Sequence, residues 1–532
     1  MPAHSLSPSA TRPVSPLETP SGLLDRASQE EHAGEIQQAM ATFREAIATA
    51  DSAQNRHIQA AALRRLAILY HHAGDSAEAR SLAERSRDVA LEAGDRLRAA
   101  EAVNVLAGVA LEVGELDRAT QLYQQAAELS QGESALMGRV EQNLGIIANV
   151  RGDWDAAKTH YRRSLAAFEA GQDERGTALA YHNLGMVSAD QQEWAAAAGH
   201  LEQARAIAQR LGDLQLEGLA RLNVAEVQIE VGRVEEAQAE VEGALGIFNQ
   251  LGSERDKADA YRVLGTIYRR TGRTTLAEAR LSDAVRLSAS TGSALSEAEA
   301  ARELALLYHD LGRNLDSVRS LTRAHRLFAK LTATRELLSV KNNVRSLENT
   351  YLSVVREWGQ SIESADSYTY GHCERVATLG AVVAETIGVD DQTALAIQFG
   401  AYLHDLGKVK VPHEILNKPG RLTDEEMAVI QQHPVWGVEL LADIDFPWDI
   451  VPIIRWHHER IDGTGYPDRL SGDEIPLSAQ IICVVDVWDA LTTRRSYRGA
   501  MSVDRALAIM QESQHWWRTE VYQAFLDTVP RN

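Results

Sequence analysis

The feature that most constrains this chain is a repeat of 40 residues, with one step of 38, between about residues 21 and 333. Each unit has an apolar stretch of helical periodicity, a turn, and small residues five and twelve positions after the turn. The turns are marked by Gly34, Gly74, Gly114, Gly152, Gly232, Gly272 and Gly312, with Gln192 in the remaining place. A helix–turn–helix unit buries its apolar face only by stacking on its neighbours. The sequence therefore predicts an α-solenoid of about eight repeats.

The repeat resembles a tetratricopeptide-repeat array of the longer, 40-residue kind. The resemblance is carried by the columns of small residues and by the pairs Leu144-Gly145, Leu184-Gly185 and Leu264-Gly265. It implies a superhelix with a large concave surface that binds a protein or peptide partner. The alternative is a scaffold or spacer, and the sequence does not identify a partner.

Two further segments flank the repeats. Residues 1–20 contain five of the thirteen prolines and are expected to form a disordered tail. Residues 334–365 are expected to form a connecting helix, because their apolar residues recur in steps of three and four. This seam consists of Leu337, Val340, Val344, Leu347, Tyr351, Val354 and Trp358. The seam predicts a homodimer through residues 337–358, and the alternative is a helix that caps the last repeat of its own chain.

Composition and charge exclude several classes of protein. The net charge of −21 argues against a protein that coats nucleic acid, so no DNA partner is expected. No apolar run is long enough to span a membrane, and the N-terminal residues lack the basic and apolar regions of a secretory signal. A cytoplasmic location is therefore expected. Two cysteines, Cys373 and Cys483, are too few for a disulfide framework or a cysteine-rich zinc site.

Residues 366–532 form the predicted C-terminal domain and contain a series of histidines and aspartates. These are His372, His404, Asp405, His433, His457, His458 and Asp486, with 24 to 32 residues between successive single residues or adjacent pairs. Imidazole and carboxylate ligands without thiolate favour iron or manganese. One histidine alone would more often be a surface or core residue than a ligand. Seven groups exceed the needs of one ion, so the pattern predicts two divalent ions that share a carboxylate and activate water for phosphoryl displacement.

These residues lie in motifs that resemble the HD-GYP family of metal-dependent phosphohydrolases, whose characteristic activity is hydrolysis of cyclic di-GMP. The matching segments include DSYTYGHCERV (366–376), HDLGKVKVP (404–412), ILNKPGRLTDEE (415–426), QHPVWG (432–437), HHERIDGTGYP (457–467), GDEIPLSAQIICVVDVWDALT (472–492) and RSYR (495–498). The resemblance implies a helical bundle with a loop that carries Gly465, Tyr466 and Pro467. The whole chain is therefore expected to be all-α, with a solenoid, a connecting helix and a C-terminal bundle.

The resemblance also implies a role for individual residues. The implied ligands of one metal ion are His372, His404, Asp405 and Asp486. The implied ligands of the second ion are Asp405, His433, His457 and His458, so that Asp405 bridges the two. Lys408, Arg495 and Arg498 are expected to contact the phosphates of the substrate, with Asp405 and Lys408 as the catalytic residues. Tyr466 is expected either to contact the substrate or only to pack within its loop.

Three positions depart from the family pattern. Tyr368 stands where some members have a glutamate that holds a third metal ion, so two ions are expected here. Ser496 replaces a proline of the closing motif, and Trp516-Trp517-Arg518 replaces a Phe-Asp-Pro triplet near the C-terminus. The last two departures affect loop geometry and none of the implied ligands.

The sequence thus predicts a cyclic di-GMP phosphodiesterase that is regulated or targeted through its tetratricopeptide repeats. One alternative is a non-catalytic cyclic di-GMP receptor or protein-interaction hub. The other is an HD hydrolase of a different nucleotide. The complete set of implied ligands favours the enzyme, because degenerate modules usually lose ligands.

Overall fold

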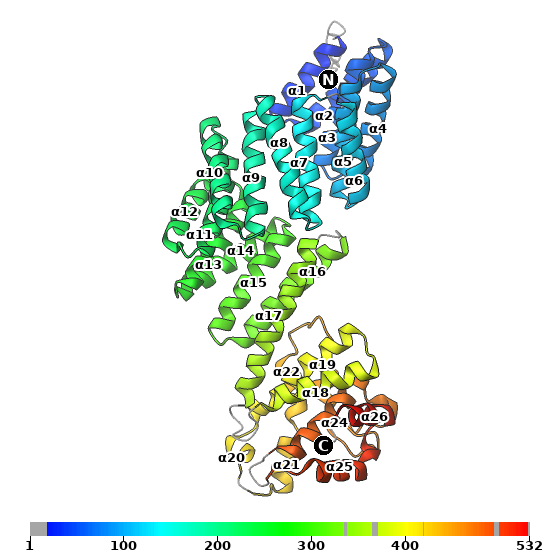
Figure 1. The fold of residues 1–532 in the computed structure, drawn as a ribbon, viewed down its shortest axis with the longest axis vertical. Coiled ribbons are helices and arrows are strands. Elements are labelled where there is room, and N and C mark those ends of the chain that lie inside the picture. The colour runs from blue at the N-terminus through cyan, green and yellow to red at the C-terminus, as the bar shows by residue number, and fades with distance from the viewer. Residues whose placement is uncertain are drawn as a thin grey trace, which may run out of the picture. The chain divides into compact units, whose positions relative to one another are not determined.

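The structure is a computed structural model that describes residues 19–130, 132–334, 338–363, 371–418, 420–493 and 499–529. In 332–334 and 338–343 it describes the backbone alone. In the described ranges the chain is helical (Figure 1), and its β-structure is one isolated bridge between Asp462 and Ser471. The all-α prediction is confirmed. The described residues fall into two compact units. The first unit contains the residues up to Asp256 and those of 332–339. The second unit contains residues 257–331 and the residues from 340 onward.

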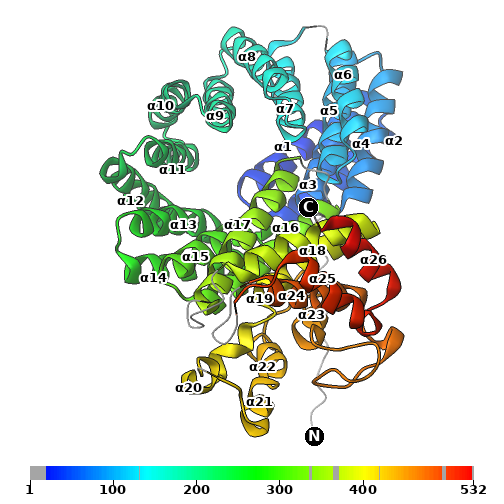
Figure 2. The same ribbon diagram turned by 60° about the horizontal axis from the view of Figure 1, so that its bottom comes forward.

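The first unit consists of helices in which each one contacts the next helix of the same unit (Figure 2). They are α1 (Pro20–His32), α2 (Ile36–Ser52), α3 (Arg56–His72), α4 (Ser76–Glu92), α5 (Arg96–Glu112), α6 (Leu116–Leu129), α7 (Ser134–Val150), α8 (Trp154–Ala170), α9 (Glu174–Asp190), α10 (Trp194–Leu211), α11 (Leu214–Glu230) and α12 (Val234–Leu251). The expected tail, residues 1–20, lies outside the described residues except for Thr19 and Pro20. Thr19 caps α1 by accepting a hydrogen bond from the backbone N–H of Gly22 at 3.2 Å.

The turn positions of the repeat lie between the two helices of each hairpin in left-handed backbone. Their φ values range from 60° at Gln192 to 84° at Gly114. Glycine adopts this conformation without steric cost, which explains its recurrence at 40-residue intervals. Gln192 adopts the same conformation, so the turn survives where the glycine does not.

Both columns of small residues are buried, with at most 1% of each side chain exposed. The first column is Ala39, Ala79, Ala119, Ala157, Ala197, Ala237, Ala277 and Ser317, and the second is Ala46, Ser86, Ala126, Ser164, Ala204, Ala244, Ala284 and Ala324. The serine hydroxyls are satisfied across the helix contact, since Ser86 donates to the carbonyl of Ala60 and Ser164 to that of Gly138, each at 2.8 Å. Small side chains at these places let neighbouring helices approach closely.

The Leu-Gly pairs have a packing reason. A Cβ atom on Gly145 would lie 2.5 Å from the ring of Tyr161, and one on Gly185 would lie 2.6 Å from the side chain of Leu201. In both hairpins a large residue of the second helix fills the space that a side chain would need. These glycines therefore fix how closely the two helices of a hairpin pack.

The second unit contains two further hairpins, the connecting helix and the C-terminal bundle. The hairpin helices are α13 (Glu254–Arg270), α14 (Thr274–Ser290), α15 (Ala294–Asp310) and α16 (Asn314–Thr334), and the connecting helix is α17 (Leu338–Glu363). The bundle helices are α18 (His372–Ile387), α19 (Asp391–Leu403), α20 (His413–Leu416), α21 (Asp424–Ile430), α22 (His433–Leu440), α23 (Val451–Trp456), α24 (Leu477–Thr492), α25 (Val503–Glu512) and α26 (Thr519–Thr528). Short 3-10 turns η1 (Leu406–Lys410), η2 (Gly472–Glu474) and η3 (Gln514–Trp516) join them. Among the described residues, no helix has the length and apolar character of a membrane span.

Helix α17 buries its apolar seam against its own chain. Leu347 and Tyr351 are fully buried. The ring of Tyr351 lies 5.3 Å from that of Phe399 and 5.2 Å from that of Trp448, both in the C-terminal bundle. Its hydroxyl lies 3.1 Å from Oγ1 of Thr322 in α16. The same tyrosine therefore contacts the last hairpin and the bundle.

The homodimer expected through residues 337–358 stays a prediction, because the packing of one chain does not test it. Within one chain, Val354 is 1% exposed and Trp358 is 9% exposed. This burial agrees with the alternative, a helix that packs on the last repeat. Leu337 and the side chain of Val340 lie outside the described part of the chain.

Candidate metal centre

Five helices and the turns at their ends bring the histidines and aspartates of the bundle together. His372 begins α18, the His404-Asp405 pair follows α19, and His433 begins α22. The His457-His458 pair follows α23, and Asp486 lies within α24. The turn after Asp405 packs directly on α22, because a Cβ atom on Gly407 would lie 1.9 Å from the carbonyl oxygen of His433.

One cluster is formed by His372, His404 and Asp486, whose potential ligand atoms all lie within 4.8 Å of one another. Nε2 of His372 is 3.3 Å from Nε2 of His404 and 3.4 Å from Oδ1 of Asp486. Oδ2 of Asp405 faces this cluster, at 3.4 Å from Nε2 of His404 and 3.8 Å from Nε2 of His372. Two imidazoles and two carboxylates thus surround one point.

A second cluster is formed by His433, His457 and His458, again with ligand atoms within 4.8 Å of one another. Nε2 of His433 is 3.3 Å from Nε2 of His457. The other oxygen of Asp405, Oδ1, lies 3.4 Å from Nε2 of His433. Each oxygen of Asp405 therefore faces a different cluster, which is the arrangement that a bridging carboxylate requires.

Hydrogen bonds on the outer side of the rings fix their orientation. Nδ1 atoms of His404, His433 and His457 each donate to backbone carbonyls of the preceding helical turn, at 2.7 to 3.1 Å. A carbonyl only accepts, so the proton of the neutral ring resides on Nδ1 and the lone pair of Nε2 points inward. This is the tautomer in which histidine binds a metal ion through Nε2.

Burial and the two carboxylates set the charges in the site. Burial lowers the pKa of His433 to about 3 and that of His458 to about 4. Burial also acts to lower the pKa of His404, but Asp405 and Asp486 raise it to about 9. Burial alone would raise the pKa of Asp405, yet Lys408 and His404 hold it well below its usual range.

The donor set fits divalent metal ions. A proton on His404 and the ammonium group of Lys408 balance the buried carboxylates, and metal cations would take over that positive charge. Nitrogen and oxygen ligands without a thiolate suit iron or manganese. Burying charged groups without partners costs free energy, and bound cations would offset that cost here.

Comparison with known proteins agrees with this geometry. Residues 359–519 match the family model of the HD domain. This chain carries an HD domain. Residues 58–132, 133–210 and 216–290 match the tetratricopeptide-repeat model, so the solenoid that precedes the HD domain is a tetratricopeptide-repeat array.

Curated relatives share the HD domain. The chain is 38% identical over 170 residues to 3'3'-cGAMP-specific phosphodiesterase 3 of Vibrio cholerae serotype O1, covering 32% of this chain and 37% of that protein. It is 40% identical over 182 residues to the cyclic di-GMP phosphodiesterase response regulator RpfG of Xanthomonas campestris pv. campestris, covering 34% and 47%. It is 37% identical over 182 residues to a cyclic di-GMP phosphodiesterase of Pseudomonas aeruginosa, covering 34% and 43%. The matched part spans less than half the length of each relative.

Lys408 of the HD domain lies in the turn η1, directly beside the carboxylate of Asp405. Its Nζ donates to Oδ2 of Asp405 at 2.7 Å. The side chain is 19% exposed, so the ammonium group borders both the buried clusters and solvent. That position suits a cation that meets a phosphate group as it reaches the metal centre.

The loop of the HD domain that contains Tyr466 is organised by Glu459, which follows His458 directly. Glu459 is fully buried. Its carboxylate accepts hydrogen bonds from the backbone N–H groups of Asp468, Arg469 and Leu470, at 2.7, 2.9 and 3.1 Å. Three donors on one buried carboxylate hold the loop against the His457-His458 turn.

Tyr466 itself packs on a candidate ligand. Its ring centroid lies 4.7 Å from that of His458 with a tilt of 31°. The preceding residue must be glycine, because a Cβ atom on Gly465 would lie 2.5 Å from Cα of Glu459. Burial raises the pKa of Tyr466, so its hydroxyl is neutral and can donate a hydrogen bond. The structure thus places Tyr466 beside His458 of the second cluster.

Sequence reasoning did not anticipate Asp489 or Glu363. Asp489 accepts a hydrogen bond from Nδ1 of His372 at 2.8 Å and another from Nε of Arg375 at 2.6 Å. It stands one helical turn after Asp486, and that spacing is the signal that could have revealed it. Glu363, the last residue of α17, accepts hydrogen bonds from the backbone N–H groups of Gly371, at 2.9 Å, and Cys373. No local motif signals that contact.

The remaining residues that the sequence analysis named divide into three groups. Arg495, Arg498, Ser496 and Tyr368 lie outside the described residues. Cys373 and Cys483 are buried free thiols. The Trp516-Trp517 segment supports the loop, since Ile461 donates its backbone N–H to the carbonyl of Trp516 at 3.0 Å and Trp517 donates to Sγ of Cys483 at 3.2 Å.

Proposed function

We propose that the HD domain hydrolyses cyclic di-GMP and that the tetratricopeptide repeats bind a protein which regulates or targets that activity. The observation that carries the enzymatic proposal is the position of Asp405, whose two oxygens each face a separate cluster of ligand atoms. Seven buried or half-buried imidazoles and carboxylates from five helices have no structural reason to converge in this way.

Two divalent ions, iron or manganese, are the proposed cofactors. His372, His404, Asp405 and Asp486 would hold one ion, and Asp405, His433, His457 and His458 would hold the other. When bound, such a pair lowers the pKa of a water and offsets the charge of a phosphodiester. Asp405 is a catalytic residue in this proposal because its carboxylate would bind both ions and so fix the distance between them.

The chain's own contribution to substrate binding is cationic and aromatic. Lys408, Arg495 and Arg498 would hold phosphate oxygens, and Lys408 would also offset the charge that grows on them during the reaction. Tyr466, whose ring lies beside His458, would stack on a base or donate a hydrogen bond to a phosphate. These side chains orient the diester for attack by water.

The comparisons favour one second candidate substrate. Relatives with similar identity over the HD domain are named as phosphodiesterases of cyclic di-GMP and of 3'3'-cGAMP. Cyclic di-GMP remains the first proposal because the HD-GYP motifs of this chain are those of enzymes with that characteristic activity. The two dinucleotides differ in one base, so contacts to that base decide between them.

A non-catalytic receptor is not favoured. Such modules usually lose ligands, whereas here the candidate ligands of both clusters are present and oriented with Nε2 inward. We further propose three domain ranges: the repeats in 21–333, a connecting helix in 334–365 and the phosphohydrolase in 366–532.

The test is to purify the full chain without oxygen, count bound metals and incubate it with cyclic di-GMP and, separately, with 3'3'-cGAMP. We expect about two metal ions per chain and a linear dinucleotide or mononucleotide product on chromatography. Asp405→Ala should retain neither metal nor turnover, while His413→Ala, an exposed histidine of the same domain, should retain both. Turnover of neither dinucleotide by the iron- or manganese-loaded protein would overturn the enzymatic proposal.

A further inference from the structure

The carboxylate of Glu363 faces the start of the helix that carries His372. Glu363 is the last residue of α17 and is 6% exposed. It accepts hydrogen bonds from the backbone N–H of Gly371, at 2.9 Å, and from that of Cys373. These two residues directly precede and follow His372 in the chain. The carboxylate of α17 thus holds the backbone on both sides of a candidate metal ligand.

Glu363 caps α18 from outside that helix. The first N–H groups of a helix have no partner within it, and Gly371, the N-cap of α18, has no side chain that could accept from them. A carboxylate is favourable at this end of a helix, whereas at the C-terminal end of its own helix it is not. The buried charge of Glu363 is therefore stabilised by the start of α18 and not by α17.

Helix α17 also meets the helix that ends before His404. Gly359 stands one helical turn before Glu363, on the same face of α17. A Cβ atom on Gly359 would lie 2.5 Å from the carbonyl oxygen of Tyr402 in α19, so the two backbones are in direct contact there. Tyr402 precedes His404 by two residues. Helix α17 therefore borders the backbone next to both histidines of the first cluster.

The earlier turns of α17 contact the last hairpin of the repeats. Nε2 of His309 in α15 lies 3.2 Å from Oε2 of Glu357. Nε2 of His325 in α16 lies 3.6 Å from Oε1 of Glu348. Between these two contacts Tyr351 is fully buried. Because a helix is a rigid element, a displacement at the last hairpin is carried along α17 to the end that holds α18.

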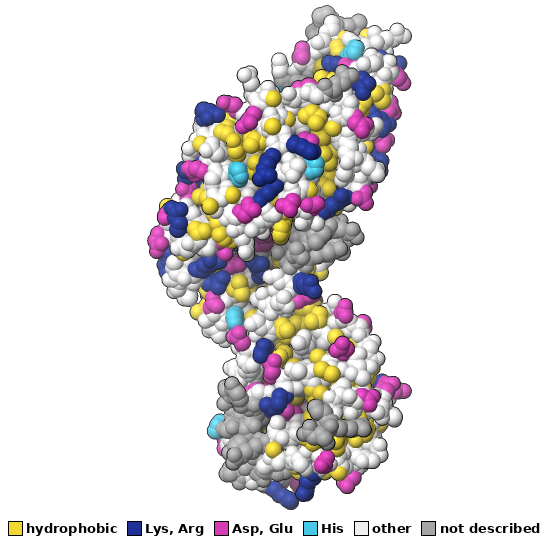
Figure 3. Space-filling view, in the orientation of Figure 1, with side chains coloured by type: hydrophobic (Ala, Val, Ile, Leu, Met, Phe, Trp, Pro, Cys, Tyr) yellow, Lys and Arg dark blue, Asp and Glu magenta, His cyan; other side chains and the backbone are white. Residues whose placement is uncertain are grey.

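Exposed charges add little to this connection. Arg356 of α17 pairs with Glu374 of α18 at 2.7 Å, with 49% and 36% of the two side chains exposed. Such pairs are weak in water, and on the face shown in Figure 3 basic and acidic side chains are interspersed. The buried contacts of Gly359 and Glu363 are therefore the ones that link α17 to the first cluster.

We propose that Glu363 is a positioning residue for the metal ion of the first cluster and that it couples α17 to this ion alone. The proposal rests on the proposed metal centre and deepens it by naming its link to the repeats. The coupling is reciprocal: an ion on His372, His404 and Asp486 stabilises α17, and a change in α17 alters the affinity for that ion. A partner that displaces α17 would then regulate the enzyme by loading or emptying one metal position.

The experiment measures Mn²⁺ binding to the full chain in two backgrounds that each break one cluster. His433→Ala leaves the first cluster, and His372→Ala leaves the second. Adding Glu363→Gln should raise the Kd for Mn²⁺ about tenfold in the His433→Ala background, because an amide offers one acceptor oxygen where the carboxylate offers two. In the His372→Ala background the Kd should stay within about twofold. A merely structural role of Glu363 would instead weaken binding in both backgrounds.

Hydrogen exchange of the same proteins measures the coupling itself. In the His433→Ala background, saturating Mn²⁺ should slow the exchange of the α17 amides about tenfold. The effect should be absent in the His372→Ala background and after Glu363→Gln. Gly359→Ala, which forces α17 away from the carbonyl of Tyr402, should reduce it as well.

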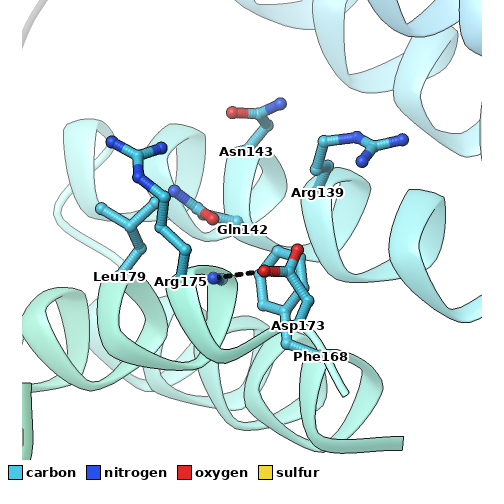
Figure 4. Close-up of a pocket in the computed structure, with 8 residues that line it drawn as sticks. Arg139, Gln142, Asn143, Phe168, Asp173, Arg175 and Leu179 are labelled. Atoms are coloured by element: carbon cyan, nitrogen blue, oxygen red, sulfur yellow. Dashed lines mark hydrogen bonds between the residues drawn. The ribbon is translucent and has the colours of Figure 1, made fainter. Parts of the chain in front are cut away.

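Two control variants change residues outside these contacts. Glu385→Gln alters an exposed glutamate of α18. Gln142→Ala alters the other compact unit, in the wall of a cavity of about 370 Å³ that Arg139 and Arg175 also line (Figure 4). Both should leave the Kd for Mn²⁺ within about twofold in either background. Circular dichroism establishes that each variant is folded.

Two results would overturn the proposal: an unchanged Kd for Glu363→Gln in the His433→Ala background, or an equal loss of affinity in both backgrounds. No nucleotide is present, so either result leaves the proposed phosphodiesterase activity standing. If the wild type bound no Mn²⁺ at all, the proposed metal centre would be wrong, and the coupling with it.

Discussion

Oδ2 of Asp489 accepts a hydrogen bond from Nδ1 of His372 at 2.8 Å, and Nε of Arg375 donates to Oδ1 of the same carboxylate at 2.6 Å. Burial alone would raise the pKa of Asp489, but the hydrogen bonds from His372 and Arg375 lower it below its usual value. The ionised carboxylate fixes the proton of His372 on Nδ1. Nε2, which faces His404, is thereby left as a metal ligand.

Asp489→Asn should weaken metal binding by about 10–100-fold, the usual effect of losing a carboxylate behind a histidine ligand. The amide has the same shape but neither the charge nor the second acceptor that Arg375 uses. Titration of the chelator-treated protein with Mn²⁺ measures the change. Asp504→Asn, at an exposed position of α25, is the matched control. Equal Mn²⁺ affinity in the two variants would show that Asp489 has no part in the site.

His433→Ala should remove one of two bound ions and leave the other. His433 belongs only to the second cluster, whereas His372, His404 and Asp486 remain intact in the first. The measured metal content should therefore fall from about two ions to about one per chain, and turnover should fall by more than about 100-fold. His413→Ala should change neither quantity. A loss of both ions from His433→Ala would mean that the clusters do not bind independently.

Glu459→Gln should destabilise the loop that carries Tyr466. In the wild type the backbone N–H donors face a carboxylate, whereas in the variant some of them face the NH₂ group of glutamine. We therefore expect the free energy of unfolding to fall by about 1–3 kcal/mol. Thermal unfolding of the HD domain measures it, with the exposed Glu512→Gln as control. An unchanged Tm for Glu459→Gln would show that the three hydrogen bonds to Glu459 are dispensable.

Two glycines of one hairpin should respond in opposite directions to substitution by alanine. A Cβ atom on Gly185 would lie 2.6 Å from Leu201, while one on Gly199, an exposed glycine of α10, meets nothing within 4 Å. Gly185→Ala should lower the free energy of unfolding by about 1–3 kcal/mol, because the added methyl group overpacks the helix contact. Gly199→Ala should gain about 0.5–1 kcal/mol through helix propensity. Urea unfolding curves decide, and a shift of both variants in the same direction would contradict the packing argument.

The repeat array should lose stability as the pH falls below about 6.5. Burial lowers the pKa of His182 in α9 to about 4. Between those two values the unfolded chain binds more protons than the folded chain, so the free energy of unfolding decreases as the pH falls. We expect His182 to contribute a loss of about 1.5 kcal/mol between pH 6.5 and 5. His182→Gln should remove that contribution, as measured by hydrogen exchange in α9. If the stability of wild type and variant depended on pH to the same extent, the prediction would be wrong.

The fold could be predicted largely from local patterns, while the details of the site could not. The left-handed turns at Gly34 and its equivalents recur with a fixed period, and any chain with that pattern must stack helical hairpins. The candidate ligands were also accessible to sequence reasoning, because adjacent polar pairs such as His404-Asp405 lie in apolar surroundings. The spacing of Asp489 from Asp486 places both on one face of α24, but its hydrogen bond to His372 depends on which face of α24 meets α18.

The connecting helix illustrates the same limit. Heptad spacing shows that Leu347, Tyr351 and Val354 share one apolar face, but it does not show what covers that face. Only the packed chain places Phe399 and Trp448 against Tyr351 and so shows what covers this part of the face. Glu363 is a second case, because its contact with the start of α18 crosses a loop.

The sequence by itself determined the all-α class, the period of the repeats and the residue types that can hold metal ions, because these depend on neighbours within one or two helical turns. The tertiary structure decided that α17 packs within its own chain, that Asp489 orients His372, and that Arg139 and Arg175 share a cavity. Each of these depends on contacts between residues distant in the chain, and such contacts are set by how whole helices pack together.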